Sequence, residues 1–418
     1  MALYYIDATN GKDDNDGLSP DRPLSSNKNL KPAPGDSVLF KRGTFIRDSL
    51  YNIGGTVEQP ITYGAYGEGE LPIFCGSYDI SSPEYWKEVE ENIWEYIGSV
   101  NDETGNIVFN DAEHCGTLRW SVEELCEQGD FFDNCFGYRC KNIPMPAEHR
   151  FYVYSVKNPG LYYTSIECVT YKDKVLANNG SNMIIENLKF INCGCCAVAG
   201  EYESRNLTVR HCVFEHIGGC VWDADQKIRY GNGVECWNIA ENVQVLNCYF
   251  EDIYDSGVTH QGMAPYCKPA DGFIVRNCVF KKCGMAAYEQ RDVMPLYAEF
   301  CDNICIDAGE GFSKQGEIMP RFSEIWPQPM GHHIFLWRIE SETPGGSVKI
   351  QRNIFHNAPY GAAIYSIIAR EAEDQTLLED NVYYTENPDL LCRWHGKDFR
   401  FFEDFSKCDK NACYQQKI

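Results

Sequence analysis

The chain has 418 residues and a formal net charge of −24, with 61 acidic and 37 basic residues. Phosphate binding requires clustered cations, so this charge argues against nucleic acid and anionic membranes as partners. Residues 1–7 carry no basic stretch and lead into no long apolar run, so we expect no signal peptide and no membrane span.

The cysteine count of 21 is high and odd. Disulfide frameworks belong to short secreted chains, whereas most of these cysteines fall in strand-like runs such as residues 211–214 and 247–250, where they act as small buried hydrophobes. Cys193, Cys195 and Cys196 could suggest a metal site, but no second Cys/His pair follows at a zinc-like spacing. We therefore expect reduced thiols, no metal ligands, no cofactor and a cytoplasmic location.

Residues 1–78 are predicted to form an N-terminal β cap with the first coils. A short strand at 4–7 leads into the turn-rich loop 10–20, which resembles a calcium loop, although Gly/Asp/Asn surface turns are commoner. Glycine-punctuated short strands follow within 34–43 and 59–69.

Residues 79–175 interrupt this pattern. The stretch 83–97 has a helical pattern followed by an irregular one, and strands are predicted at 107–111 and 151–155. We expect an inserted β-rich subdomain that packs on the first coils.

From residue 176 onward a short phrase recurs. Its four copies lie at residues 233–237, 257–261, 287–291 and 311–315. A phrase that returns every 24 to 30 residues indicates a solenoid in which each copy is one coil. We predict coils over residues 176–385, which carry the active face, and a C-terminal cap over 386–418.

Asparagine or cysteine also recurs ahead of short apolar strands. The positions are Asn187, Cys212, Cys248, Cys278, Asn303, Asn353 and Asn381. Asparagine suits tight turns because its side chain bonds the local backbone, so we expect a structural ladder along the inside of a turn. A long interruption at 316–346 is typical of the loops that line the binding face of a solenoid.

Strand residues alternate between two faces. If Val234, Val258, Tyr288 and Phe312 point inward, two columns of other residues must point outward. The first column is Glu235, Thr259, Glu289 and Ser313, and the second is Trp237, Gln261, Arg291 and Gln315. Two carboxylates on one face of a rigid stack are the strongest indication of catalysis in the sequence.

Several phrases resemble known carbohydrate-active proteins. Those at 5–20, 35–43 and 60–67 resemble right-handed parallel β-helix proteins that act on carbohydrates. Those at 230–237, 255–262 and 331–337 are most similar to glycoside hydrolase family 141 and its relatives. The resemblance implies an all-β fold, a right-handed parallel β-helix (solenoid), and glycosidase activity by two carboxyl residues.

Glycoside hydrolysis needs one carboxyl group as acid and another as base or nucleophile. Glu235 and Glu289 lie two coils apart, so their Cβ atoms should be roughly 9.6 Å apart, and both retaining and inverting outcomes stay open. Asp255 is a candidate acid or base at the rim, or only a turn former. His260 is a candidate general base, or a histidine bonded within the stack.

Further residues are candidates for substrate binding. The aromatic ones, which could stack on sugar rings, are Trp222, Trp237 and Trp337, and the polar ones are Gln261, Arg291, Lys314, Gln315 and Arg338. The two cations Arg291 and Lys314 would also suit a carboxylated sugar.

That possibility supports a rival function, a polysaccharide lyase or uronate epimerase on the same fold. Tyr288, His260 or Lys314 would then abstract the C5 proton. Against it, we find no dense acidic cluster for calcium beside the repeats. A second alternative is a non-catalytic glycan-binding solenoid, which predicts aromatic stripes without paired acids. We favour a cytoplasmic glycoside hydrolase acting on imported oligosaccharides, and the sequence leaves a homo-oligomer open.

Overall fold

The computed structural model describes most of the chain. The described residues are 1–100, 102–138, 140, 144–146, 148–171, 175–200, 203–314, 330–385, 391–400 and 402–416. Within these ranges the α-helices are single turns of four residues each, α1 (Pro159–Tyr162), α2 (Arg370–Glu373) and α3 (Phe402–Phe405). In this described part, no helix is long and apolar enough to span a membrane.

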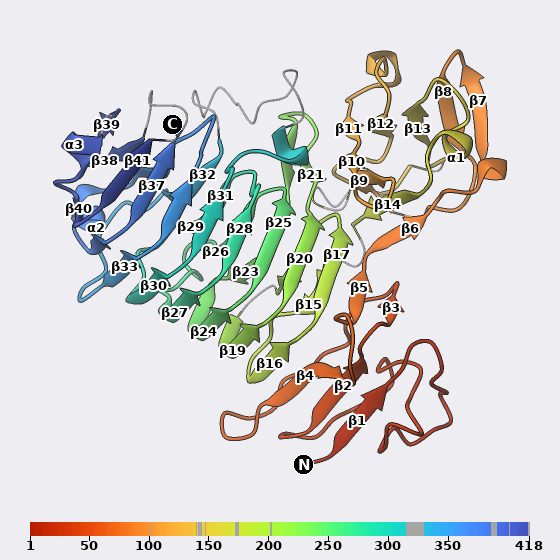
Figure 1. Cartoon of the computed structure of the whole chain (residues 1–418), viewed down its shortest axis with the longest axis horizontal. Helices are drawn as coiled ribbons and strands as arrows, with labels where there is room; N and C mark the ends of the chain where they lie inside the picture. The colour runs from red at the N-terminus through yellow and green to blue at the C-terminus, as the bar shows by residue number, and fades with distance from the viewer. Residues whose placement is uncertain are drawn as a thin grey trace.

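Three long sheets run along the molecule, and successive coils add strands to them (Figure 1). Sheet A contains β1 (Leu3–Ile6), β2 (Ser37–Lys41), β4 (Ile61–Tyr66), β16 (Met183–Glu186), β19 (Glu203–Arg210), β24 (Ile239–Leu246), β27 (Asp271–Arg276), β30 (Tyr297–Cys301), β33 (Ser347–Gln351), β36 (Thr376–Glu379) and β40 (Asp409–Lys410). Sheet B contains β3 (Phe45–Ile46), β5 (Ile73–Cys75), β17 (Lys189–Cys193), β20 (Val213–Ile217), β25 (Tyr249–Ile253), β28 (Val279–Lys281), β31 (Ile304–Ile306), β34 (Ile354–His356), β37 (Val382–Thr385) and β41 (Cys413–Gln416).

Sheet C completes the coils. It contains β15 (Val175–Asn178), β18 (Cys196–Ala199), β23 (Val234–Trp237), β26 (Ser256–Gln261), β29 (Ala286–Arg291), β32 (His332–Trp337), β35 (Ile364–Ile367), β38 (Cys392–Trp394) and β39 (Lys397–Phe399). The coil-to-coil pairs are parallel in all three sheets, and only the terminal pair β38–β39 of sheet C is antiparallel. The predicted parallel β-helix is confirmed.

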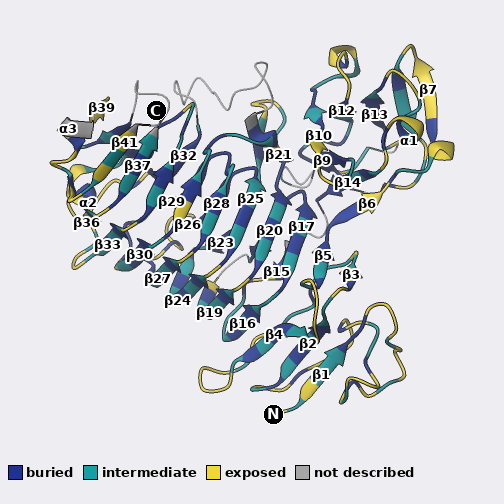
Figure 2. Cartoon of the chain, viewed as in Figure 1, coloured by how far each residue is buried: buried dark blue, intermediate teal, exposed yellow. Residues whose placement is uncertain are grey.

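The interior of the solenoid is filled by apolar side chains that stack from coil to coil. Phe190, Phe214, Phe250 and Phe280 form one such column on sheet B, with neighbouring ring centroids 5.4, 4.6 and 4.8 Å apart. These distances are close to the strand spacing of about 4.8 Å, so the rings stack one per coil through the core. Figure 2 shows buried residues running through the stacked coils, whereas β7 (Trp86–Glu90) is largely exposed.

A second column is polar. The Nδ2 atoms of Asn303, Asn353 and Asn381 each donate to a backbone carbonyl of the preceding coil, at 3.2, 2.9 and 2.8 Å. Cys278 continues the column, with its thiol directed at a carbonyl 3.6 Å away. The predicted ladder is therefore present. Its predicted first member is wrong, because Asn187 has a left-handed φ of 56° and lies at the corner one residue before the column.

The segment between β6 (Ser77–Asp79) and β14 (Ile166–Thr170) forms its own sheets, outside the three long ones (Figure 1). One contains β6, β14, β9 (Thr104–Phe109) and β10 (His114–Cys115), and the other contains β7, β8 (Ile93–Tyr96), β13 (Phe151–Tyr154), β12 (Asp130–Asp133) and β11 (Thr117–Leu118). A separate hydrophobic cluster that includes Phe131 and Val153 lies mostly within it and also takes in Val221.

Two sequence predictions of local structure differ from the fold. The helix predicted over 83–97 is wrong, because after one 3₁₀ turn the chain forms the antiparallel hairpin β7–β8, which reverses near Asn92 with its φ of 64°. The fourth repeat copy is also wrong, since Phe312–Lys314 is a 3₁₀ helix, η3, that follows two left-handed glycines. The segment after 385, predicted as a C-terminal cap, adds the last strands to all three sheets.

Replacing Asn353 with alanine is expected to lower the free energy of unfolding by about 2–4 kcal/mol, because buried backbone groups of the preceding coil lose their partners. Its Oδ1 accepts from the Asn303 amide at 3.0 Å and its Nδ2 donates to the Phe300 carbonyl at 2.9 Å. Denaturation followed by circular dichroism measures the loss. Asn353→Cys places at this position the residue type found at Cys278, and it should lower the free energy of unfolding by less than the alanine change. An alanine variant as stable as the wild type would contradict the role of the ladder.

Candidate active site on the outer face of sheet C

The register of sheet C decides which residues share a face. Val234 pairs with Val258, and Val258 with Tyr288, and all three are fully buried in the core. Because strand residues alternate, their neighbours Glu235 and Glu289 project from the outer face, in register through Thr259. The predicted outward columns therefore hold for the first three copies.

The fourth member of each column differs from the prediction. Glu289 pairs with Phe335, and Arg291 pairs with Trp337, because β32 supplies the next strand. Ser313 lies in η3 and is not part of the column. Phe335 and Trp337 belong to an apolar cluster separate from the solenoid core, so aromatic side chains cover this end of the outer face.

Glu235 is half-buried and held by neutral donors. Its Oε2 accepts from Asn232 Nδ2 at 2.6 Å and from Gln261 Nε2 at 2.8 Å, and the Cys196 thiol lies 3.6 Å away. Burial raises the pKa of Glu235, and the bond from Asn232, the charge of Arg291 and the bond from Gln261 oppose the rise. Two amide donors on one oxygen stabilise the ionised form of this carboxyl group.

Glu289 is more deeply placed, with only 1% of its surface exposed. Its Oε1 accepts from the Trp337 indole at 2.7 Å and its Oε2 accepts from the Ser256 hydroxyl at 3.1 Å. Burial raises the pKa of Glu289, and the nearby charge of Asp255 adds to the rise, whereas Arg291 opposes it. This environment favours the protonated carboxyl group.

A short polar chain connects the two glutamates. Asn232, which donates to Glu235, accepts from the Ser256 amide at 3.0 Å, and the hydroxyl of Ser256 bonds Glu289. Sequence reasoning missed both linking residues. Their signal was present, because Asn232 and Ser256 each directly precede the glycine that opens an aligned repeat copy.

Cationic and aromatic side chains lie beside the pair. The Arg291 guanidinium lies over Trp237 at 5.9 Å and over Trp337 at 5.1 Å, measured to the ring centroids. The Arg291 Nε donates to Asp292 Oδ2 at 3.0 Å, and Asp292 Oδ1 lies 3.6 Å from the Nε of Arg338. Arg338 also lies over the Trp337 ring. The structure thus brings together four of the predicted binding residues.

Asp255 lies next to this cluster, immediately before β26. Its Oδ2 accepts from the Gly231 amide at 3.0 Å, and the side chain is largely buried. The negative charge of Asp255 contributes to the raised pKa of Glu289. Asp255 is therefore placed to tune the pKa of that glutamate.

Two other predicted site residues are placed differently, and two more are not tested by the structure. The prediction that His260 lies on this face is wrong. His260 is two residues after Val258 on the same strand, so it points into the coil, where it is buried. Its Nδ1 lies 3.0 Å from the Gln290 side-chain amide. Burial lowers the pKa of His260 to about 4. Trp222 lies apart on β21 (Cys220–Asp223), which pairs only with β22 (Ile228–Tyr230). The side chain of Lys314 and the whole of Gln315 lie outside the described residues.

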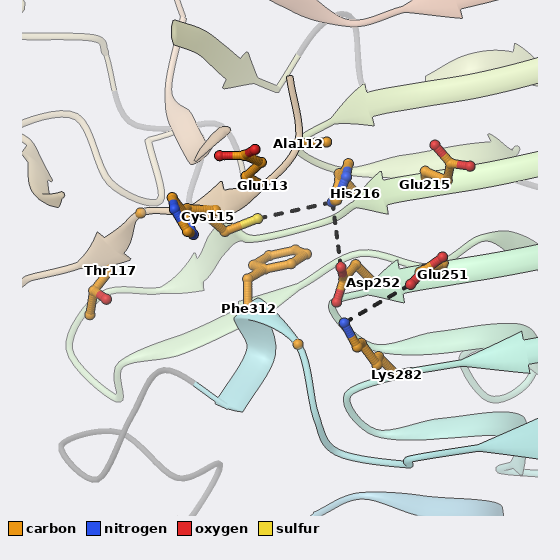
Figure 3. A pocket seen from close by; sticks show the side chains of 13 residues that line it. Ala112, Glu113, Cys115, Thr117, Glu215, His216, Glu251, Asp252, Lys282 and Phe312 are labelled. Atoms are coloured by element: carbon orange, nitrogen blue, oxygen red, sulfur yellow. Dashed lines mark hydrogen bonds and ion pairs between the residues drawn. The ribbon is translucent and has the colours of Figure 1, made fainter. Parts of the chain in front are cut away.

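A cleft of about 530 Å³ lies elsewhere, between sheet B and the hairpin β9–β10. Figure 3 shows the His216 imidazole between Cys115 and Asp252, with Nδ1 3.9 Å from the thiol and 3.7 Å from the carboxylate. Burial lowers the pKa of His216 and raises that of Asp252. The sequence did not predict this cleft, because its two walls are more than 90 residues apart in the chain.

Comparison with known proteins found no matching family model and no matching curated protein. Among solved structures, XylC in complex with xylose is 13% identical with a TM-score of 0.56, and the match covers 94% of this chain and 64% of that chain. The chain therefore spans less than two thirds of the length of XylC.

Two further neighbours are named as carbohydrate-active enzymes. GH136 lacto-N-biosidase from Eubacterium ramulus is 14% identical over 100% of this chain and 68% of that chain, with a TM-score of 0.47. Pectate lyase Pel9A is 13% identical over 92% of this chain and 70% of that chain, with a TM-score of 0.49. At such identities the likeness is one of fold.

The raised pKa of Glu289 predicts a pH-dependent stability. The folded protein holds a proton that the unfolded chain releases, so stability falls as the pH rises between the unfolded and the folded pKa. Glu289→Gln removes this titration while keeping the shape. The thermal midpoint of the variant relative to wild type should therefore rise as the pH increases above the ordinary pKa of a glutamate.

Calorimetry at several pH values measures the effect. Glu58→Gln is the matched control, because it makes the same chemical change at an exposed glutamate. Parallel curves for Glu289→Gln and wild type would contradict a protonated Glu289.

Proposed function

We propose that this chain is a glycoside hydrolase whose carboxyl pair is Glu235 and Glu289. The observation that carries the proposal is the placement of two glutamates on one rigid outer face, two coils apart and connected through Asn232 and Ser256. The resemblance of several phrases to glycoside hydrolase family 141 supports the same function.

The environments of the two carboxyl groups suit different roles. Glu289, buried and close to Asp255, holds a proton and serves as the acid that protonates the leaving oxygen. Glu235, held by two amide donors, is the base or nucleophile. For Glu289 to reach a sugar, the leaving oxygen must replace the Trp337 indole as its hydrogen-bond partner.

Substrate binding is assigned to the residues around this pair. Trp237 is half-buried and offers a ring for stacking on a sugar, and Arg291 and Gln261 offer donors for hydroxyl or carboxylate oxygens. The substrate class proposed is a short oligosaccharide.

The lyase or epimerase alternative is less well supported. Of its three candidate bases, His260 and Tyr288 are both buried inside the coil, on the opposite face of sheet C from Glu235. Neither can abstract a proton from a sugar on the outer face. A non-catalytic glycan-binding solenoid would not require two glutamates with raised pKa values on one face.

The cleft beside His216 is a less suitable place for hydrolysis. Three of its four carboxylates have cationic or ionisable partners, since Glu251 and Glu215 each bond a lysine at 2.6 Å and Asp252 faces the histidine. Among the described residues, the hydrogen-bond partners of Glu235 and Glu289 are neutral. Neutral partners leave a carboxyl group free to give or take a proton.

The cellular setting is also part of the proposal. Most of the 21 cysteines are buried in the structure. Reduced core thiols suit a cytoplasmic protein, and a cytoplasmic glycosidase would receive imported oligosaccharides rather than intact polymers.

Glu235→Gln and Glu289→Gln are each expected to lower kcat/KM by about 10²–10⁴-fold, because each removes one proton-transfer group. A screen of aryl glycosides and short oligosaccharides, with products weighed by mass spectrometry, measures the loss. Glu241→Gln is the matched control, since Glu241 follows in the same coil but lies on sheet A. Each cleavage should add one water.

Two outcomes would overturn the assignment. Products with an unsaturated uronate would identify a lyase, and both glutamates would then be structural. Full activity in Glu235→Gln and Glu289→Gln would place the chemistry at another site.

The alkaline limb of the pH–rate profile tests the role of Asp255. Removing its charge with Asp255→Asn should lower the pKa of Glu289, so the acid loses its proton at lower pH and the alkaline limb moves to lower pH. Asp271→Asn, an exposed change on sheet A, should leave the profile in place. An unmoved limb in Asp255→Asn would contradict Glu289 as the acid.

A further inference from the structure

We propose that the segment inserted between β6 and β14 holds a transition-metal ion of the zinc class, bound by Asp133, Cys135 and His149. The ligand atoms of these three residues lie within 4.8 Å of one another. They offer one oxygen, one sulfur and one nitrogen, which are the donor types that zinc takes from proteins. The sequence predicted no metal ligands.

The distances between the ligand atoms are slightly shorter than those around a bound metal ion. Asp133 Oδ1 lies 2.9 Å from Cys135 Sγ and 2.9 Å from His149 Nε2. Tetrahedral zinc with bonds of about 2.0–2.3 Å holds its ligand atoms roughly 3.5 Å apart. A metal ion would replace the protons in these two hydrogen bonds. The ligand atoms would then have to move apart by roughly 0.6 Å.

Regular structure positions all three ligands. Asp133 is the last residue of β12 and pairs with Phe151, the first residue of β13. His149 comes two residues before that pair and Cys135 two residues after Asp133. The antiparallel ladder β12–β13 thus brings the two ends of one loop together, which no short sequence spacing would reveal.

Contacts behind the ligands orient them for metal binding. His149 Nδ1 lies 2.6 Å from the Val100 carbonyl, which can only accept, so Nδ1 carries a hydrogen and Nε2 faces the ligand cluster. Metal-binding histidines are oriented by this kind of bond. Asp133 Oδ2 accepts from the Thr104 amide at 2.9 Å, which leaves Oδ1 directed at Cys135 and His149.

Charge and burial favour a cation at this place. Asp133 and Cys135 are buried, and the His149 side chain is 14% exposed, so an ion can enter from that side. Two more buried carboxylates bind the loop that follows Cys135. Glu103 accepts from the Gly137 amide at 2.9 Å and Asp102 accepts from the Tyr138 hydroxyl at 2.7 Å. A dication would offset the charge of the Asp133 carboxylate and of the Cys135 thiolate that binds it.

Three protein ligands leave a fourth tetrahedral position for water. Because the ligands lie at both ends of the loop between β12 and β13, the bound ion would hold these two ends together and stabilise the inserted segment by binding only its folded form. This role is independent of the carboxyl pair on sheet C. The alternative is a purely hydrogen-bonded Asp133–His149 pair.

Cobalt substitution distinguishes the two. The full-length protein is stripped with a chelator and titrated with Co²⁺ alone under reducing conditions. We expect one equivalent to produce the near-ultraviolet band of a cobalt–thiolate bond and the visible bands of tetrahedral cobalt, and zinc to displace both. Cys135→Ser should abolish the thiolate band, whereas Cys126→Ser should retain it, because Cys126 is an exposed cysteine of the same segment.

A second variant covers the case in which Cys135→Ser fails to fold. His149→Ala changes a residue nearer the surface, keeps the thiol and should weaken cobalt binding by about tenfold or more. The absence of a thiolate band in the wild type would overturn the proposal. So would a band of unchanged intensity in Cys135→Ser, or unchanged affinity in His149→Ala.

Discussion

Parallel pairing between neighbouring coils is the constraint on which the rest of this structure depends. Each strand pairs with the next in a single register. When one residue of a strand faces the core, the residues that pair with it in the other coils must also face the core. With Val234, Val258 and Tyr288 in the core, Glu235 and Glu289 must project outward. A slip of one residue would exchange the two faces. The buried valines and phenylalanines therefore determine where the carboxyl groups lie.

The repeat period and the alternation of residues were sufficient to predict the solenoid and the outward position of the two glutamates. The same alternation could also have excluded His260, which has the parity of Val258 and so belongs inside the coil. The fourth repeat could not be placed by period alone, because the chain between sheets B and C is longer in that coil. There the glycines at 309 and 311 end the strand pattern, and the apolar run of β32 supplies the strand instead.

Contacts between distant segments could not be predicted. The link from Asn232 through Ser256 to Glu289 crosses coils, and it depends on register as well as on residue type. The cluster at Asp133 depends on a β ladder whose two strands are separated by a loop. Turn-forming and strand-forming residues indicate that such elements exist. They do not indicate which side chains the elements bring together, because pairing partners are chosen by the whole fold.

The central claim is that the outer face of sheet C binds and cleaves a sugar. The most direct test is a crystal structure of Glu289→Gln, slowed in catalysis, with an oligosaccharide substrate bound. The account predicts a sugar ring against Trp237, with the scissile bond between the side chains at 235 and 289. A sugar bound instead in the cleft beside His216 and Asp252, with the face of sheet C empty, would contradict it.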